Sequence, residues 1–412
     1  MTTDLHGPLA AYAARLHTTI GDRHHVASPL GAWLLLALAA ATGPDRVDHP
    51  VAEALTDALG TDLDTAATIA RALLDAPHPL VASATALWHR PGQGDGGPAD
   101  WRAALPSTTE VGALPDQAGL DAWAREHTLG LIERFPLTVG PDVVLALASA
   151  LATRVSWAEP FDVADAHALG ADSPWARRLR RALRTPEHGH RCAIATTPEA
   201  GDVITHAASA QADGGAGLVV LSVAAGPQVP PTDVLAAAYR ISAGAADGAQ
   251  PAGHRALFDL PLGDAPLWTV REERVRTRAR DGREERHTAV LPCWSARSEH
   301  DLTGPALGFA AASATLGKAL ALPVRNFEAR QVAMATFGRY GFEAAAVTGM
   351  FGLTSLPPEG VRRTAELRFG HPYAVVAVAT DRRSDGTTGP WHGVPVFSAW
   401  IAEPEELPDA DA

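Results

Sequence analysis

The spacing of apolar residues predicts helices in the first third of the chain. Over residues 9–20 the apolar positions recur with the helical period. Ser28 followed by Pro29 is typical of a helix N-terminus, because the serine hydroxyl can cap the first turn and proline is tolerated there. We expect one or two further helices within residues 48–74, and an amphipathic helix over residues 119–135.

From about residue 141 the pattern changes to one that favours strands. Residues 143–155 form a continuous apolar run, which fits either a buried strand or a helix. Residues 269–288 alternate Arg and Glu with smaller residues around Asp281 and Gly282, which predicts a hairpin with both faces partly in water. Strands are also expected at 217–224, 374–380 and 394–401. Helices followed by strands indicate α+β packing rather than repeated βαβ units.

Composition describes a globular chain with one main domain. The 412 residues are 46% hydrophobic and 20% charged, with a net charge of −13. We expect a single domain over residues 1–402 and a frayed acidic tail over 403–412. The acidic balance argues against nucleic acid or a membrane as a partner. With no signal peptide and no apolar run long enough to span a bilayer, a cytoplasmic location is expected, and export by an unrecognised route is the alternative.

The side chains that usually carry chemistry do not form an enzyme pattern. The chain contains no GxSxG, HExxH or nucleotide-binding glycine motif, so we expect no enzymatic activity and no cofactor. Cys192 and Cys293 lack metal-site spacing, and free thiols are expected. His188, His190 and Cys192 fit a metal site on one strand face or a solvated loop, and we prefer the loop and no metal.

Two arginine-rich stretches have two interpretations. Residues 177–181 and the Arg/Glu stretch 271–287 fit either a patch for a polyanion or a solvated surface. The interleaved glutamates favour the solvated surface.

The stretch GFEAAAVTGMFGLTSLPPEG, residues 341–360, has an unusual composition. It has no charge between Glu343 and Glu359, and two internal glycines disfavour a helix. In an extended chain, alternate side chains share a face. One face would consist of uncharged and mostly small residues, namely Phe342, Ala344, Ala346, Thr348, Met350, Gly352 and Thr354. The stretch is therefore able to form a strand over a filled core, and an ordinary flexible loop is the alternative.

Six segments in the same order resemble the serpins. They are HHVASPL (24–30), SATALW (83–88), WAREHTLG (123–130), SALATRVSWAEPFD (149–162), LPCWSARSEHDL (291–302) and FGHPY (369–373). The chain resembles a bacterial serpin-like protein along nearly its whole length, most weakly over residues 163–290. The resemblance implies an α+β fold with a large mixed central β-sheet, further β-sheets and a set of N-terminal helices.

The resemblance also implies a function for residues 341–360, which match the reactive-centre loop of the family. In serpins a protease cleaves this loop, and the cut loop inserts into the large sheet with the acyl-enzyme attached. The expected hinge is Gly341, Phe342, Glu343, Ala344, Ala345, Ala346, Val347 and Thr348. The chain is then a suicide inhibitor of a serine protease. The alternative is a non-inhibitory serpin-fold protein that is cleaved as a substrate or acts as a binding module.

Counting from the hinge places the reactive bond at Ser355–Leu356, with Leu353 and Thr354 as rival positions. Such small or aliphatic residues suit a subtilisin-like or elastase-like protease as partner better than a trypsin-like one, which needs Arg or Lys. We expect the inhibitor to be a monomer.

Two regions of the sheet are expected to control its opening. The shutter and breach positions are Ser28, Ser149, Trp157 and Gln331. Ser149 and Gln331 replace the Asn and His usual in the family, and a hydrogen bond between them is a candidate substitute. Phe342 also departs from the family hinge, and overpacking of the core by its ring would cost about 1–3 kcal/mol.

Overall fold

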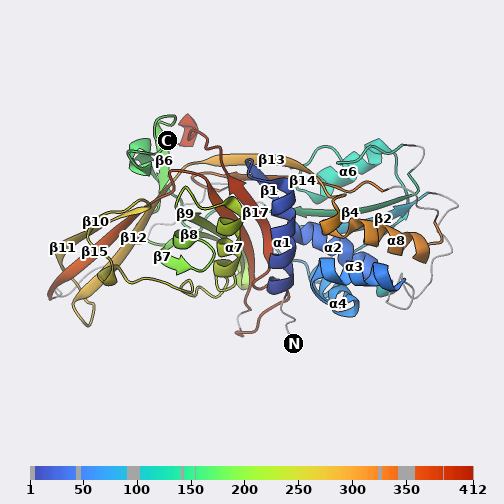
Figure 1. Ribbon diagram of the computed structural model, residues 1–412, viewed down its shortest axis with the longest axis horizontal. Coiled ribbons are helices and arrows are strands. Elements are labelled where there is room, and N and C mark those ends of the chain that lie inside the picture. Colours follow the sequence, from blue (N-terminus) through green and yellow to red (C-terminus); the bar gives the residue numbers. More distant parts are fainter. Residues whose placement is uncertain are drawn as a thin grey trace.

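The computed structural model describes residues 5–42, 48–90, 103–140, 143–153, 155–322, 327–341, 358–383 and 385–411. It has an elongated α+β architecture (Figure 1). The central sheet has the order β1-β17-β16-β9-β8-β7. Its strands are β1 (His25–Ala27), β7 (Arg191–Thr197), β8 (Gly201–Gln211), β9 (Ala216–Ala225), β16 (Tyr373–Asp381) and β17 (Pro395–Ile401). Every residue of β9 is buried, which explains its continuous apolar sequence.

Most helices lie in one half of the molecule, and those of the first third occur in the segments where the apolar spacing predicts them (Figure 1). They are α1 (His6–Ile20), α2 (Pro29–Ala40), α3 (His49–Leu59), α4 (Leu63–Leu74) and α8 (Phe309–Ala319), and α7 (Pro231–Ser242) lies on β16 and β9 (Figure 1). All residues of α2 are buried, as expected for a helix that is apolar on every side. The predicted cap is confirmed, since Ser28 Oγ accepts the Gly31 N–H at 3.1 Å.

Two further sheets have three and two strands. One has the order β3-β2-β4, from β2 (Ala82–His89), β3 (Glu110–Ala113) and β4 (Leu145–Ala152). The other pairs β13 (Trp294–Asp301) with β14 (Arg330–Phe337). The ambiguous run 143–155 is thus a strand, because β4 pairs with β2 along its whole length. Helix α6 (Gln117–His127) packs on this sheet through Trp123, whose ring lies 5.2 Å from that of Trp88.

The fourth sheet has the order β10-β11-β15-β12-β6-β5. Its strands are β5 (Asp162–Asp165), β6 (Arg181–Arg184), β10 (Gly263–Asp264), β11 (Trp268–Arg276), β12 (Arg283–Leu291) and β15 (Glu359–Arg368). Strands β11, β15 and β12, with the turn 277–282, project from the body, and we call them the arm (Figure 1).

The structure corrects the predicted hairpin at 269–288. Its strands and turn are present, but β15 lies between them, antiparallel to β11 and parallel to β12. The local Arg/Glu pattern indicates two half-exposed strands. It carries no information about a third strand, β15, which comes from residues after 358 and lies between them.

Two other predictions differ from the structure. Helix α6 ends at His127 instead of near residue 135, because Leu129 (φ 55°) and Gly130 (φ 77°) take left-handed conformations. The tail after residue 402 is docked and not frayed. Glu405 N–H donates to Cys293 O at 2.7 Å, and the Glu406 carboxylate accepts the Arg180 N–H at 2.7 Å.

Both cysteines are free thiols, as expected. Among the helices that the structure describes, none has the length and apolar character to cross a membrane.

Candidate functional site

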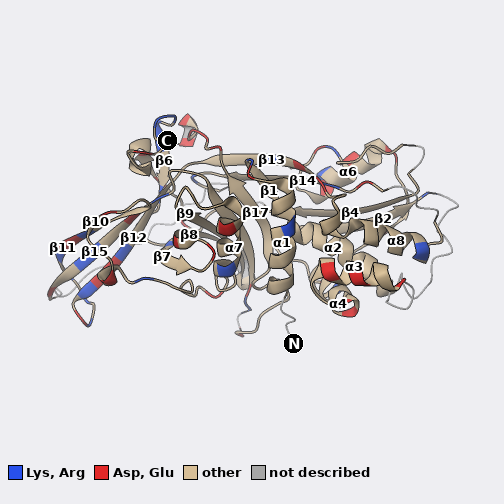
Figure 2. Cartoon of the chain, viewed as in Figure 1, with Lys and Arg blue, Asp and Glu red and all other residues tan. Residues whose placement is uncertain are grey.

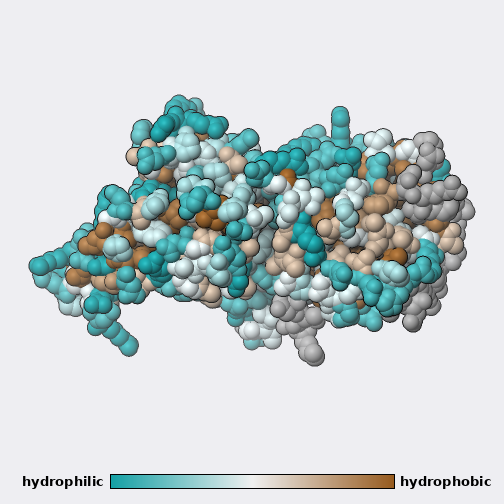
Figure 3. Space-filling model, viewed as in Figure 1, coloured by the Kyte–Doolittle hydropathy of each residue, from teal (hydrophilic) through white to brown (hydrophobic). Residues whose placement is uncertain are grey.

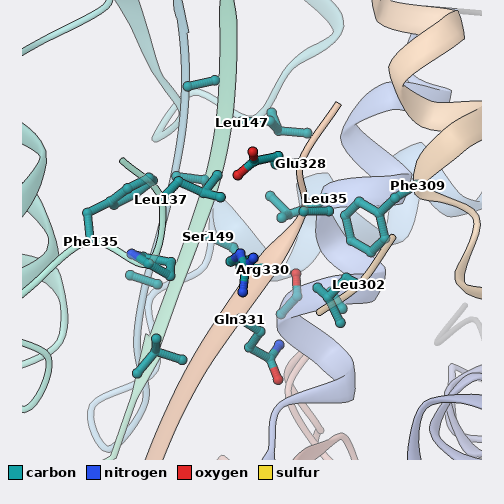
Figure 4. Close-up of a pocket in the computed structure, with 18 of the residues that line it drawn as sticks. Leu35, Phe135, Leu137, Leu147, Ser149, Leu302, Phe309, Glu328, Arg330 and Gln331 are labelled. Atoms are coloured by element: carbon teal, nitrogen blue, oxygen red, sulfur yellow. Dashed lines mark hydrogen bonds between the residues drawn. The ribbon is translucent and has the colours of Figure 1, made fainter. Parts of the chain in front are cut away.

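An open groove separates β4 from β14. Among the described strands β4 pairs only with β2, and β14 pairs only with β13, so each is an edge strand with one row of unpaired backbone groups. The cavity between them has a volume of about 690 Å³ and is lined by both strands (Figure 4). Its lining follows the chain from Val143 to Leu151. At ~3.3 Å per residue this is roughly 26 Å, the length of a strand. We call this groove the slot.

Apolar side chains line the slot on both of its faces. Figure 4 shows Leu35 of α2 and Phe309 of α8 on one side, and Phe135 and Leu137 from the segment after α6 on the other. A strand between them would point alternate side chains at each set. Charged groups among the labelled lining residues are Glu328 and Arg330, and the Arg330 guanidinium lies 3.3 Å from the Glu299 carboxylate.

The N-terminus of α2 ties both walls of the slot together. The Gln331 side chain accepts the Ser28 N–H at 2.9 Å and donates to Ser28 O at 2.8 Å. From the opposite wall, Ser149 Oγ donates to Gly31 O at 3.0 Å. The candidate Ser149–Gln331 hydrogen bond is therefore replaced by two separate links to the same helix end. Gly31 permits this approach, because a Cβ there would lie 3.3 Å from Ser149 Oγ.

The walls meet again around Trp157. Its backbone N–H donates to Tyr340 O at 3.1 Å, and its indole N–H donates to Gly338 O at 2.9 Å. Trp157 is buried, with its ring 5.2 Å from that of Phe337. Ser149 and Gln331 both bind the N-terminus of α2, and Trp157 and Gly338, which follow them in the sequence, bind each other. Strands β4 and β14 therefore run in the same direction. A strand that returned into the slot from residue 341 would be antiparallel to both walls, a favourable ladder geometry.

Gly341 occupies a position that only glycine fits. Its φ is +77°, and a Cβ would lie 2.4 Å from Val155 O. It also forms an isolated bridge with Ser156. This glycine is the predicted hinge residue that the structure describes, and it stands at the end of the slot where the walls meet. The other predicted loop positions, Phe342 to Thr348, Leu353, Thr354, Ser355 and Leu356, lie outside the described residues.

Buried histidines beside α2 are a feature that sequence analysis missed. His17 and His25 share a hydrogen bond of 2.8 Å between Nδ1 and Nε2, and His300 Nε2 donates to Val26 O at 2.7 Å. Tyr239 donates to Ser398 Oγ, which lies 2.7 Å from His17 Nε2. Because Ser398 Oγ accepts from Tyr239, it donates its own proton to His17 Nε2, and His17 Nδ1 then donates to His25 Nε2. The adjacent His24 and His25 were the only local signal, because the partners are distant in sequence.

Burial keeps these rings uncharged. It lowers the pKa of His25 to about 4, with the charges of His300, Arg23 and His24 acting in the same direction. The pKa of His17 lies well below its ordinary value for the same main reason. The cluster is therefore neutral near pH 7 and links α1, β1 and β13 through hydrogen bonds.

The candidate metal stretch has other partners. His190 Nδ1 lies 3.0 Å from His206 Nε2, and its Nε2 donates to Glu159 O at 2.8 Å. Burial raises the pKa of the Cys192 thiol to about 12, so the thiol stays protonated. Over the described ranges, no group of at least three His, Cys, Asp or Glu side chains is placed to hold a metal ion.

Comparison with known proteins gives a likeness in structure. No family model matches the sequence, and no curated protein matches it either. Tengpin, a thermophilic serpin in its native state, is similar with a TM-score of 0.61 and 11% identity, over 98% of this chain and 95% of that one. Human thyroxine-binding globulin with its hormone has a TM-score of 0.61 and 14% identity, over 98% and 99% of the two chains.

A plant protein has the same likeness. Arabidopsis AtSerpin1, in a native stressed conformation, has a TM-score of 0.58 and 14% identity, over 98% of this chain and all of that one (100%). Such low identities establish architecture and leave the activity open. With the slot, its tied walls and the order of its elements, this chain has the serpin fold.

Proposed function

We propose that the chain is a serpin-type suicide inhibitor of a serine protease. The observation that carries the proposal is the slot between the unpaired edges of β4 and β14. The segment expected to be the reactive-centre loop leaves the described structure at Gly341, at one end of that slot. Over the described ranges no strand occupies this position, and the segment that follows Gly341 has strand-compatible chemistry, which together support insertion of the loop.

The chemistry follows from a cut at Ser355–Leu356. The protease serine Oγ attacks the Ser355 carbonyl carbon, the peptide C–N bond breaks, and the amine of Leu356 leaves with a proton from the protease histidine. The fragment that now ends at Ser355 carries the protease as an ester. The other fragment begins at Leu356 and continues into β15 of the arm.

Insertion would be favourable because it pairs both edges of the slot. Each new backbone hydrogen bond contributes about 0.5–1.5 kcal/mol net. The small uncharged face of the segment would lie against the apolar lining formed by residues such as Leu35 and Phe309. Small and aliphatic residues at the cut favour a subtilisin-like or elastase-like protease as the target, and the inhibitor would act as a monomer.

A non-inhibitory role is the second candidate. Thyroxine-binding globulin, which has the same fold, is known as a complex with thyroxine. In this alternative the loop is cleaved as an ordinary substrate and the chain acts by binding.

The test is incubation with subtilisin or pancreatic elastase, followed by a denaturing gel. We expect a stable adduct whose mass is that of the enzyme plus residues 1–355. Cleavage without any adduct would overturn the inhibitor proposal in favour of the second candidate.

A matched pair of variants sharpens the result. Ala344→Arg places a charge on the face that would enter the core, and it should convert the inhibitor into a substrate. Ala345→Arg places the same charge on the opposite face, where Phe135 and Leu137 are only half-buried, so the guanidinium can reach water and the adduct should be kept. Equal behaviour of the two variants would contradict insertion of this segment as a strand.

A further inference from the structure

We propose that the free end of the arm is a docking surface for an acidic face of the protease that cleaves the loop. This inference rests on the proposed function, because it concerns the same encounter. The surface consists of Arg274, Arg278 and Arg280, around the turn 277–282, and all three are exposed. Figure 2 shows Lys and Arg colouring at this end, and Figure 3 shows that it is hydrophilic.

The arm places this surface next to the end of the loop. Thr277 N–H donates to Pro358 O at 3.0 Å, and Val361 N–H donates to Gly282 O at 2.8 Å. Pro358 follows the reactive segment directly in the sequence. A protease bound to residues near 355 therefore has only a few residues of chain between its active site and the turn.

The carboxylates of the arm are engaged with other partners. The Glu284 carboxylate binds Arg362 at 2.8 Å, and the Glu272 carboxylate binds Arg363 at 2.8 Å. Glu273 lies 3.4 Å from the Arg362 guanidinium. Each of these pairs joins β15 to a neighbouring strand inside the arm. Glu285 accepts the Leu257 backbone N–H at 2.9 Å, so it too is used within the fold.

The arginines at the free end differ from the other charged residues of the arm. Across the described residues, no carboxylate pairs with Arg274, Arg278 or Arg280. Asp281 accepts the backbone N–H of Arg283, and Glu359 faces Arg276 across the ladder. The alternation of Arg and Glu in the sequence suggests a balanced surface, yet the pairing leaves positive charge concentrated at the end of the arm.

The position of this charge favours a protease over a polyanion as the occupant. A chain with a net charge of −13 repels polyanions as a whole, and the positive charge is confined to one projecting end. That end is the part of the arm that a loop-bound protease would approach. Complementary charge at such a place accelerates encounter, and it does so most at low ionic strength.

The experiment measures how fast subtilisin consumes the intact chain. Three proteins are compared at 20 and 300 mM NaCl: the unchanged chain, the triple variant R274E/R278E/R280E, and a control. The control, R125E/R134E/R297E, changes the net charge equally with exposed arginines outside the arm. The readout is the second-order rate constant for loss of the intact chain, whether the product is an adduct or a cleaved chain.

We expect the arm variant to react about 10-fold more slowly at low salt, with a much smaller difference at high salt. The control should stay within about 2-fold of the unchanged chain. Equal rates for both variants would overturn the docking surface. Failure of the inhibitor proposal would show separately, as cleavage without adduct at salt-dependent rates. Loss of heparin binding in the arm variant, with unchanged protease rates, would also overturn the proposal and identify a polysaccharide site.

Discussion

At the scale of single residues, the buried histidines couple the stability of the fold to pH. The folded state keeps His25 neutral because its pKa is lowered to about 4 from the ordinary 6.5. Between these values the unfolded chain binds more protons than the folded chain, so the free energy of unfolding falls as the pH falls. Stability is therefore fully present above pH 6.5 and is progressively lost toward pH 4.

We expect acidification from pH 7.5 to pH 5 to lower the free energy of unfolding by about 2 kcal/mol through His25 alone. The measurement is urea unfolding at both pH values. His25→Asn should flatten the pH dependence, although it is less stable at pH 7.5. The exposed His49→Asn is the control and should follow the unchanged chain. Parallel pH profiles for His25→Asn and the unchanged chain would contradict this role.

Gly341 gives a second prediction at this scale. Gly341→Ala places a Cβ 2.4 Å from Val155 O on a backbone with φ of +77°, and it should lower the free energy of unfolding by about 1–3 kcal/mol. Gly338→Ala is the matched control, because a Cβ there would meet no atom within 4 Å. Thermal unfolding of both variants tests the difference. An equal effect would mean that the close approach at Gly341 is easily relieved.

Whether a residue's contacts could be predicted depends on how far apart the two partners lie in the sequence. The Ser28 cap was predictable because its partner Gly31 lies three residues away. The contacts of Trp157 with residues 338–340, and of His17 with Ser398, needed the tertiary structure. The expectation that Gly341 is a hinge rests on the resemblance, whereas the need for glycine there follows from the close approach of Val155 O.

At the scale of elements, α2 acts as the common anchor of two strands that do not pair with each other. Gln331 makes two hydrogen bonds to the Ser28 backbone, whereas Ser149 makes one to Gly31 O. Opening the slot further requires these links to break. Their unequal number suggests that β14 is held more firmly than β4.

Gln331→Ala should therefore destabilise the chain more than Ser149→Ala. The first leaves the buried N–H of Ser28 without a partner, at about 1–3 kcal/mol, while Ser28 O keeps the Ala32 N–H; the second removes one hydrogen bond worth about 0.5–1.5 kcal/mol. Urea midpoints at pH 7.5 provide the comparison. A larger effect of Ser149→Ala would show that β4 is the wall held by the helix.

The helices and strands themselves were easier to predict than which strands lie next to each other in the sheets. Periodicity located α1, α2 and the late strands β16 and β17, since each carries its own apolar pattern. It could not place β15 between β11 and β12, nor separate β4 from β14, because pairing is a property of the assembled sheet.

At the scale of the whole molecule, no described strand lies between β4 and β14. Among the described residues the two edges that border the slot have unpaired backbone groups, and a strand between them would join the β3-β2-β4 and β13-β14 sheets into one. The cleaved form should accordingly be the more stable one.

We expect cleavage within residues 353–356 to raise the melting temperature by roughly 10 °C, since ten new hydrogen bonds contribute about 5–15 kcal/mol and such a shift needs about 9 kcal/mol in a chain of 412 residues. Differential scanning calorimetry before and after limited elastase digestion gives the value. The Ala344→Arg variant is the control and should lose most of the rise. An unchanged melting temperature in the cleaved chain would show that the slot stays empty.

The position of β15 affects how long the molecule keeps this unfilled state. Its paired residues run from Leu367 to Glu359 against β11, and from Arg368 to Val361 against β12. An uncut loop could occupy the whole slot only by pulling β15 away from both neighbours at once. Storage alone should then not inactivate the protein. A sample kept for weeks would be as competent as a fresh one, and its working life would end at its first encounter with a protease.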